Sequence, residues 1–139
     1  MKGIMNNAIV KIIKEKLEGC GGQASVPLLR GNRNFQVRLV DNGVEVSNLR
    51  SYPFLPWEVF IKTIELLDKN NGVAKKGNGR GSDKLGDGAV ALDTIEGYIA
   101  REVYGKNIGE SVFRRITPIC NILIWAGVCE NGKGTLKKI

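Results

Sequence analysis

The apolar stretch near the C-terminus, ITPICNILIWAG (residues 116–127), constrains the fold of this chain most. Beyond Asn121 it has no polar face, and a helix that is apolar all round is buried on every side. One face can pack within its own small domain. The other must contact the N-terminal region, a second copy of the chain or a different protein. We favour a homodimer through residues 118–126, because the helix expected near the N-terminus must also cover a β-hairpin.

That N-terminal helix is predicted from Asn6 to Glu18, since apolar residues recur there at helical spacing and glycines follow at 19, 21 and 22. Its polar face carries acids and its apolar face has no aromatic residue, which favours a core helix over one that lies on a membrane. The apolar stripe consists of Ala8, Ile9, Ile12, Ile13 and Leu17.

The strongest β signal is Asp41-Asn42-Gly43, which separates two runs of alternating apolar and polar residues, 35–39 and 44–47. Asn-Gly favours a tight hairpin turn, because both residues tolerate a positive φ. A two-residue loop there would pair Leu39 with Val46 on one face of the sheet.

Prolines set further boundaries. Pro27 confines a short strand over 25–29 to the edge of a sheet. Pro53 and Pro56 follow the hairpin, and Pro56 suits the first position of a helix over 57–69 that stops at Asn70-Asn71-Gly72. We therefore divide the chain into a helix-and-hairpin region, 1–51, and a second domain, 52–139.

A glycine-rich connector over about 73–91 follows this helix and carries the cations Lys75, Lys76 and Arg80. It lacks the glycine and lysine spacing of a phosphate-binding loop. Two interpretations stay open. Residues 74–88 form a mobile surface loop, which we favour, or they form a flexible basic arm that contacts phosphates or a minor groove.

The remaining elements are two helical segments and a hairpin. Asp93 followed by Glu96 is close to a capping box and predicts a helix that Gly105 closes. A second helical segment begins near Ser111, and Thr117-Pro118 predicts either a kink in it or a new start. A final hairpin turns at Asn131-Gly132.

Helix, basic connector, helix, helix and hairpin is the order of a winged helix-turn-helix. Residues 122–139 resemble the end of the winged-helix domain at the N-terminus of Mrr-type restriction proteins, with Trp125-Ala126-Gly127 at the helix end and Lys133-Gly134 at the wing turn. The expected fold is therefore α+β: an N-terminal helix with a small antiparallel hairpin or sheet, then a C-terminal winged helix-turn-helix. The catalytic domain of that family is absent, so nuclease activity does not carry over.

In a helix-turn-helix the second helix enters the major groove with its N-terminal side chains leading, and the wing contacts the neighbouring backbone. Arginine can bind guanine in a bidentate manner or bind phosphate. The predicted DNA-binding residues are Ser111, Phe113, Arg114, Arg115, Thr117 and Asn121 around the helix, Lys133 and Lys137 on the hairpin, and Lys75, Lys76 and Arg80 on the connector.

The charge balance agrees with such a partner. Lys and Arg total 21 against 14 Asp and Glu, a formal net charge of +7. An anionic partner is expected, with nucleic acid first and an anionic membrane second. A basic surface with no partner is the plain alternative. We expect no signal peptide and no membrane span, and so a cytoplasmic protein with Cys20, Cys120 and Cys129 reduced.

The chain contains no histidine, which excludes Ser-His-Asp and Cys-His nucleophiles and argues against a zinc site. A carboxylate-metal nuclease site could use Asp41 and Glu45. Ser47 stands where such a site would carry a lysine, so a solvent-facing hairpin acid is the better interpretation. No cofactor is expected.

The sequence therefore favours a non-enzymatic protein that binds double-stranded DNA, a regulator or accessory factor of a mobile-element or restriction-type system. The alternative is a protein-interaction module on a winged-helix scaffold, an inhibitor or adaptor, whose arginines lie at a protein interface.

Overall fold

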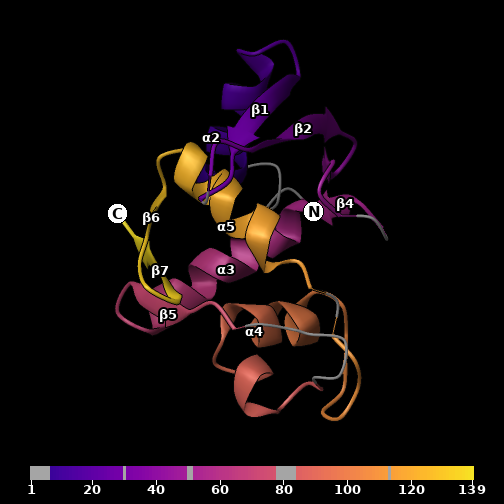
Figure 1. Cartoon of the computed structure of the whole chain (residues 1–139), viewed down its shortest axis with the longest axis vertical. Helices are drawn as coiled ribbons and strands as arrows, with labels where there is room; N and C mark the ends of the chain where they lie inside the picture. Colours follow the sequence, from indigo (N-terminus) through magenta and orange to yellow (C-terminus); the bar gives the residue numbers. More distant parts are fainter. Residues whose placement is uncertain (1–6, 30, 50–51, 78–83, 113) are drawn as a thin grey trace.

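The computed structural model describes residues 7–29, 31–49, 52–77, 84–112 and 114–139. Within these ranges it combines α-helices with two antiparallel sheets, so the expected α+β class is confirmed. The helices are α2 (Ala8–Glu18), α3 (Trp57–Lys69), α4 (Ile95–Glu102) and α5 (Ile116–Trp125). The N-terminal sheet lies at one end of the molecule and α4 at the other, with α3 and α5 between them (Figure 1). None of the helices in the described ranges is long and apolar enough to cross a membrane.

The N-terminal sheet has the strand order β1-β2-β3-β4. Its strands are β1 (Gln23–Pro27), β2 (Asn34–Val40), β3 (Gly43–Val46) and β4 (Phe54–Pro56). β1 lies at the edge, as Pro27 predicted, because proline lacks the N–H that a central strand needs. The sequence did not predict β4, since three residues that end in a proline are too few to show an alternation.

The turn between β2 and β3 differs from the prediction. The structure pairs Leu39 with Val44, whereas a turn at Asn42-Gly43 would have paired it with Val46. Asn42 takes the positive φ of 66° that the turn requires, and Gly43 already belongs to β3. The pairing moves by two residues, so the same side chains still share a face of the sheet.

The second sheet has the order β5-β7-β6, with β5 (Val73–Lys75), β6 (Cys129–Asn131) and β7 (Thr135–Lys138). The predicted C-terminal hairpin is confirmed, but its loop is residues 132–134. Asn131, predicted as a turn residue, belongs to β6 and pairs with Leu136. β7 is the central strand because β5, from the connector after α3, pairs with it.

The glycine-rich connector is packed at both of its ends. Its first residues form β5, and its last part contains the short 3₁₀ turn η1 (Gly88–Val90). Leu85 and Val90 are buried in a small second cluster of apolar side chains. The expectation of a mobile loop over 74–88 is therefore wrong for its described ends. Single apolar residues among glycines and charges gave no periodic signal of this packing.

The start of α4 lies one residue later than the capping-box pattern indicated. Thr94 is the N-cap, and its Oγ1 accepts the Gly97 N–H at 3.1 Å. Glu96 does not fold back onto the first turn of its own helix. Its carboxylate points towards α5 instead.

The start of α5 also differs from the prediction. Residues 111, 112, 114 and 115 are not helical, and Ser111 forms an isolated bridge with Lys84. The helix begins at Ile116 and runs without a break through Pro118. Proline fits in the first turn of a helix, where its missing N–H would have had no partner.

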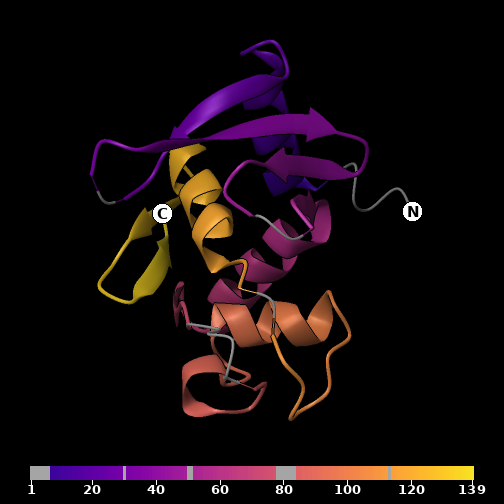
Figure 2. The ribbon, with the colours of Figure 1, turned by 45° about the vertical axis from the view of Figure 1, so that its right-hand side comes forward.

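α5 is covered by its own chain. It contacts β1, α3 and β6, and seven of its ten residues are buried. Figure 2 shows it below the N-terminal sheet and beside the C-terminal hairpin. At its end, Lys16 of α2 donates to the Trp125 carbonyl oxygen at 2.7 Å and lies 4.6 Å from the centroid of the indole ring. Contacts within the same chain therefore bury the apolar side chains of α5, and a second copy of the chain is not needed to cover them.

One core cluster takes side chains from both sides of the predicted boundary at 51/52, among them Val37, Phe60 and Leu123. β4, from the second part, completes the sheet of the first. The division into two domains stays a prediction from the sequence.

We expect Gly43→Ala to lower the free energy of unfolding by about 1–3 kcal/mol, the usual cost of overpacking. A Cβ at this position would lie 2.1 Å from the backbone oxygen of Leu55 and 2.9 Å from the Cα of Pro56, so β3 and β4 would have to separate. Urea denaturation measures the change. Gly88→Ala is the control, because a Cβ there meets no atom within 4 Å. Equal unfolding midpoints for the two variants would contradict this close approach.

Candidate functional site

The N-terminus of α5 is held by a buried carboxylate from α4. Glu96 is only 3% exposed. Its Oε1 accepts the backbone N–H of Arg115 at 2.8 Å, and its Oε2 accepts that of Ile116 at 3.1 Å. The first N–H groups of a helix have no acceptor within the helix, and a carboxylate there is also favoured by the helix dipole. Glu96 therefore fixes where α5 begins.

Burial raises the pKa of Glu96 from its ordinary value of 4.5 to about 7. The hydrogen bonds from the Arg115 and Ile116 backbone lower this pKa, as do the positive charges of Arg114 and Arg115, but they do not cancel the effect of burial. The carboxyl group thus titrates near neutral pH.

Arg115 lies inside the molecule. Its side chain is 2% exposed, and Nη1 donates to the Tyr52 carbonyl oxygen at 2.8 Å. The guanidinium lies 5.0 Å from the centroid of the Tyr52 ring and 5.4 Å from that of Tyr104. It therefore connects the segment before β4 to the region between α4 and α5. A side chain with so little exposed surface does not reach a DNA duplex. Arg115 is therefore not part of the candidate DNA-binding surface.

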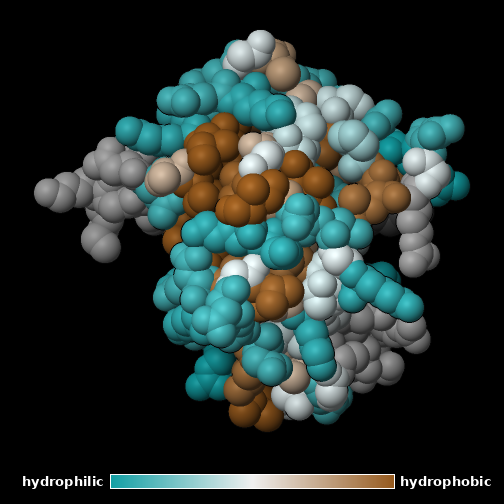
Figure 3. Space-filling view, turned by 90° about the vertical axis from the view of Figure 1, so that its left-hand side faces the viewer, coloured by the Kyte–Doolittle hydropathy of each residue, from teal (hydrophilic) through white to brown (hydrophobic). Residues whose placement is uncertain are grey.

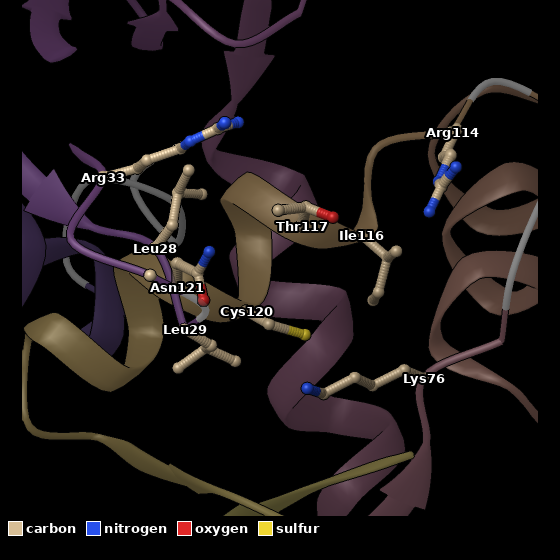
Figure 4. Close-up of a pocket in the computed structure, with 10 residues that line it drawn as sticks. Leu28, Leu29, Arg33, Lys76, Arg114, Ile116, Thr117, Cys120 and Asn121 are labelled. Atoms are coloured by element: carbon tan, nitrogen blue, oxygen red, sulfur yellow. The ribbon is translucent and has the colours of Figure 1, made fainter. Parts of the chain in front are cut away.

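An open groove of about 630 Å³ lies beside the N-terminus of α5. Arg33, Lys76 and Arg114 line it from three separate parts of the chain (Figure 4). Arg33 lies in the loop between β1 and β2, Lys76 follows β5, and Arg114 precedes α5. No acidic side chain is among the described residues that line the groove. Its electrostatic field therefore favours an anionic ligand.

Lys76 is fixed by its neighbours. Its backbone N–H donates to the Gly134 oxygen at 2.9 Å, and its own carbonyl oxygen accepts the Glu96 N–H at 3.0 Å. Its ammonium also donates to the Asn131 side chain on β6. The connector, the start of α4 and the hairpin are thus joined at one edge of the groove.

The floor of the groove is apolar. Leu28, Leu29, Ile116 and Cys120 line it, and Leu29 is 48% exposed. Burial raises the pKa of the Cys120 thiol to about 12, so the thiol is neutral at physiological pH. On the face that carries the C-terminal hairpin, apolar atoms gather between hydrophilic groups (Figure 3).

Thr117 and Asn121 of α5 add polar groups to this floor. They lie four residues apart and so share one face of the helix. Thr117 is exposed, whereas Asn121 is 3% exposed. The helix thus presents one hydroxyl at the surface of the groove and one carboxamide deeper in it.

The structure brings together only part of the predicted set, namely Lys76, Arg114, Thr117 and Asn121. Ser111 accepts a hydrogen bond from Lys84 Nζ at 2.8 Å outside this lining. Lys75 and Lys133 are exposed on β5 and at the hairpin tip, and Lys137 lies 3.8 Å from Glu130. Phe113 and Arg80 fall outside the described residues.

Sequence reasoning missed Arg33 and the two leucines of the groove. The signal was present in RGNR, residues 30–33, a short basic sequence directly after Leu28-Leu29. Nothing in its spacing connected that sequence to a helix more than 80 positions later. Only the contact of β1 with α5 brings the two segments together.

The alternative carboxylate site gains no support from its surroundings. Glu45 forms an ion pair with Arg38 of the neighbouring strand. In the part of the chain that the structure describes, no three His, Cys, Asp or Glu residues are grouped so that they could hold a metal ion.

No protein-family model, curated protein or solved structure matches this chain. The resemblance of residues 122–139 to Mrr-type winged helices therefore stays an expectation from the sequence.

The raised pKa of Glu96 predicts a pH-dependent stability. The folded state holds the proton more tightly than the unfolded state, so this group makes the free energy of unfolding fall as pH rises from about 4.5 to about 7. Glu96→Gln removes that titration. Relative to wild type, the variant should therefore gain up to about 3 kcal/mol across this range, since one pKa unit corresponds to about 1.4 kcal/mol.

Urea denaturation at a series of pH values measures the difference. Glu18→Gln, which removes an exposed carboxylate of α2, is the matched control and should follow wild type. Parallel profiles for Glu96→Gln and wild type would show that the buried carboxyl does not titrate here.

The two adjacent arginines should differ in their effect on stability. Arg115→Ala removes the bond to Tyr52 and the stacking on two rings, and should cost about 2–4 kcal/mol. Arg114→Ala removes an exposed side chain and should change stability by less than about 0.5 kcal/mol. Thermal denaturation compares them, and a larger loss for Arg114→Ala would reverse the assignment.

Proposed function

We propose that this chain is a non-enzymatic DNA-binding protein that contacts the phosphates of double-stranded DNA along the groove and the C-terminal hairpin. One observation supports this most. Arg33, Lys76 and Arg114 reach one open groove from separate parts of the chain, and no acid is found among its described lining residues. Phosphate contacts by Lys and Arg supply most of the affinity of proteins for DNA.

We also infer that residues from α3 to β7 form a winged helix. The order α3, β5, α4, α5 and β6–β7 hairpin supports this, as does the three-stranded sheet β5-β7-β6. In this assignment α5 is the second helix of the helix-turn-helix, and the hairpin is the wing with Lys133 at its tip.

The proposed contact differs from insertion of a whole recognition helix. β1 packs against α5, and Thr117 is its exposed residue while the others are buried or half-buried. DNA would therefore meet the N-terminal end of α5, with Arg114 just before it and Lys133 on the wing. This placement favours contacts with phosphates over contacts between the side chains along α5 and the base edges in the major groove.

The biological setting that we propose, a regulator or accessory factor of a mobile-element or restriction-type system, rests on the Mrr-type resemblance alone. No catalytic step is assigned.

A protein-interaction module is the second candidate, because the groove has an apolar floor. Leu29, at 48% exposed, is an unusual side chain for a surface that binds only phosphates. An inhibitor or adaptor would place an acidic, partly apolar segment of a partner in the same groove.

DNA binding should weaken steeply with salt. If roughly 3–6 phosphates are contacted, log affinity should fall with log salt with a slope of about −3 to −5. Arg114→Ala and Lys76→Ala should each reduce the size of that slope by about one. Fluorescence anisotropy with a duplex at several salt concentrations measures both quantities.

Lys11→Ala is the matched control, because it removes an exposed cation of α2 that does not line the groove. Lys11→Ala should leave the slope of log affinity against log salt nearly unchanged. DNA binding by the groove would be rejected if wild type did not bind at low salt, or if all three variants lowered the slope equally. Either result would favour the interaction module.

A further inference from the structure

Glu96 lies directly behind the lining of the groove. Its backbone N–H donates to the Lys76 carbonyl oxygen at 3.0 Å, and its Oε2 accepts the N–H of Ile116 at 3.1 Å. Its Oε1 accepts the N–H of Arg115, the residue that follows Arg114. Lys76, Ile116 and Arg114 all line the groove (Figure 4). The side of the groove with Lys76 and Arg114 is therefore built around one buried carboxyl.

The charge of this carboxyl opposes the binding of an anion on the same side. Arg114 is close enough to lower the pKa of Glu96, so the ionised carboxylate reduces the positive potential around Arg114 by a matching amount. An anion beside Arg114 and the Glu96 carboxylate repel each other, since their charges have the same sign. The repulsion acts through the field, so it does not require one phosphate to contact several cations. Protonation of Glu96 removes it.

Glu96 changes its charge near neutral pH, whereas its buried neighbours do not. Burial raises the pKa of Glu96 to about 7, and it raises the pKa of Tyr104 and of Cys120 to about 12, so those two stay neutral. The chain contains no histidine, the side chain that ordinarily titrates near neutral pH. The charged and titratable groups that interact electrostatically with Glu96 are Arg114, Arg115, Tyr104 and Cys120; Lys76 acts on Cys120 and Glu58 on Tyr104, while Tyr98 and Glu102 of α4 interact with Lys69 of α3.

The direction of the pH effect follows from the two states of the carboxyl. With Glu96 protonated, the positive charges of Arg114 and Lys76 attract an anion more strongly. The carbonyl oxygen of the protonated group still accepts an N–H, so the start of α5 stays attached to α4. A bound anion in turn raises the pKa of Glu96 further, because anion binding and protonation favour each other by the same free energy.

We propose that the groove binds the phosphate backbone of a nucleic acid together with one proton, which Glu96 takes up, so that affinity rises as pH falls through neutrality. The proton comes from the solvent and adds to a carboxylate oxygen, and no bond of the ligand changes. Because Glu96 is only 3% exposed, it acts through its charge and through Lys76 and Arg114, without touching the ligand. This inference rests on the proposed binding of DNA and names a regulation of that site.

Fluorescence anisotropy with a labelled duplex, at constant ionic strength, tests this coupling. Wild-type affinity should fall about 2- to 10-fold from about pH 6 to about pH 8, below the limit of about tenfold per pH unit for one linked proton. Glu96→Gln resembles the protonated carboxyl, so it should bind at every pH as tightly as wild type does at the lowest. Glu18→Gln, which removes an exposed acid of α2, should keep the wild-type profile.

Proton uptake can also be measured on wild type, which keeps the proposal testable if Glu96→Gln does not fold. Isothermal titration calorimetry near pH 7, in two buffers with different ionisation enthalpies, should show uptake of about 0.3–0.5 proton for each chain that binds. A wild-type affinity that does not change with pH, no proton uptake, or a Glu96→Gln profile parallel to that of wild type would each overturn the inference while duplex binding could still stand.

The two proposals can fail separately. Long-chain inorganic polyphosphate is a second probe, since it offers phosphates without bases or a duplex. If polyphosphate binds more tightly as pH falls, in a way that Glu96→Gln abolishes, while the duplex does not bind, the proposed function is rejected and the proton-linked groove is kept. If neither probe binds at any pH, both proposals are rejected.

Discussion

The two hydrogen bonds from the backbone of Arg115 and Ile116 to the Glu96 carboxylate fix the position of α5 relative to α4. Much of the candidate site depends on them. Where α5 begins determines that Arg114 stays outside, that Arg115 turns inward to Tyr52, and that Thr117 and Asn121 face the groove. Burial raises the pKa of this carboxyl to about 7 although the two hydrogen bonds lower it, so this junction is also the point where the fold responds to pH near 7.

The second determinant is the cover that the N-terminal sheet gives to α5. β1 packs against the helix, and the loop that follows it brings Leu28, Leu29 and Arg33 to the same opening as Lys76 and Arg114. The cover excludes most of α5 from a DNA duplex, and the same contact creates a groove with an apolar floor and a basic rim. The basic side chains of such a groove favour an anionic ligand.

Local signals predicted the elements well where the pattern was long or the turn chemistry was strong. The helix over residues 57–69, the β2–β3 hairpin and the C-terminal hairpin each agree with the structure in type. Errors arose where a tertiary contact replaced a local one. Glu96 looked like a partner of its own helix start, yet it binds the start of another helix. Gly43 looked like a turn residue, yet the backbone of β4 requires it.

The sequence by itself determined the α+β class and the excess of positive charge. It also determined that the helix ending at Trp125 must be covered. These properties follow from composition and periodicity, which can be read within single segments of the chain. Only the tertiary structure decided what covers that helix, which of two adjacent arginines is exposed, and which cations share a groove. Those outcomes depend on contacts between residues far apart in the chain, such as Lys76 with Asn131 and Glu96 with Ile116. The spacing of residues within one segment does not specify which distant segment it will contact, since the same pattern is compatible with several neighbours.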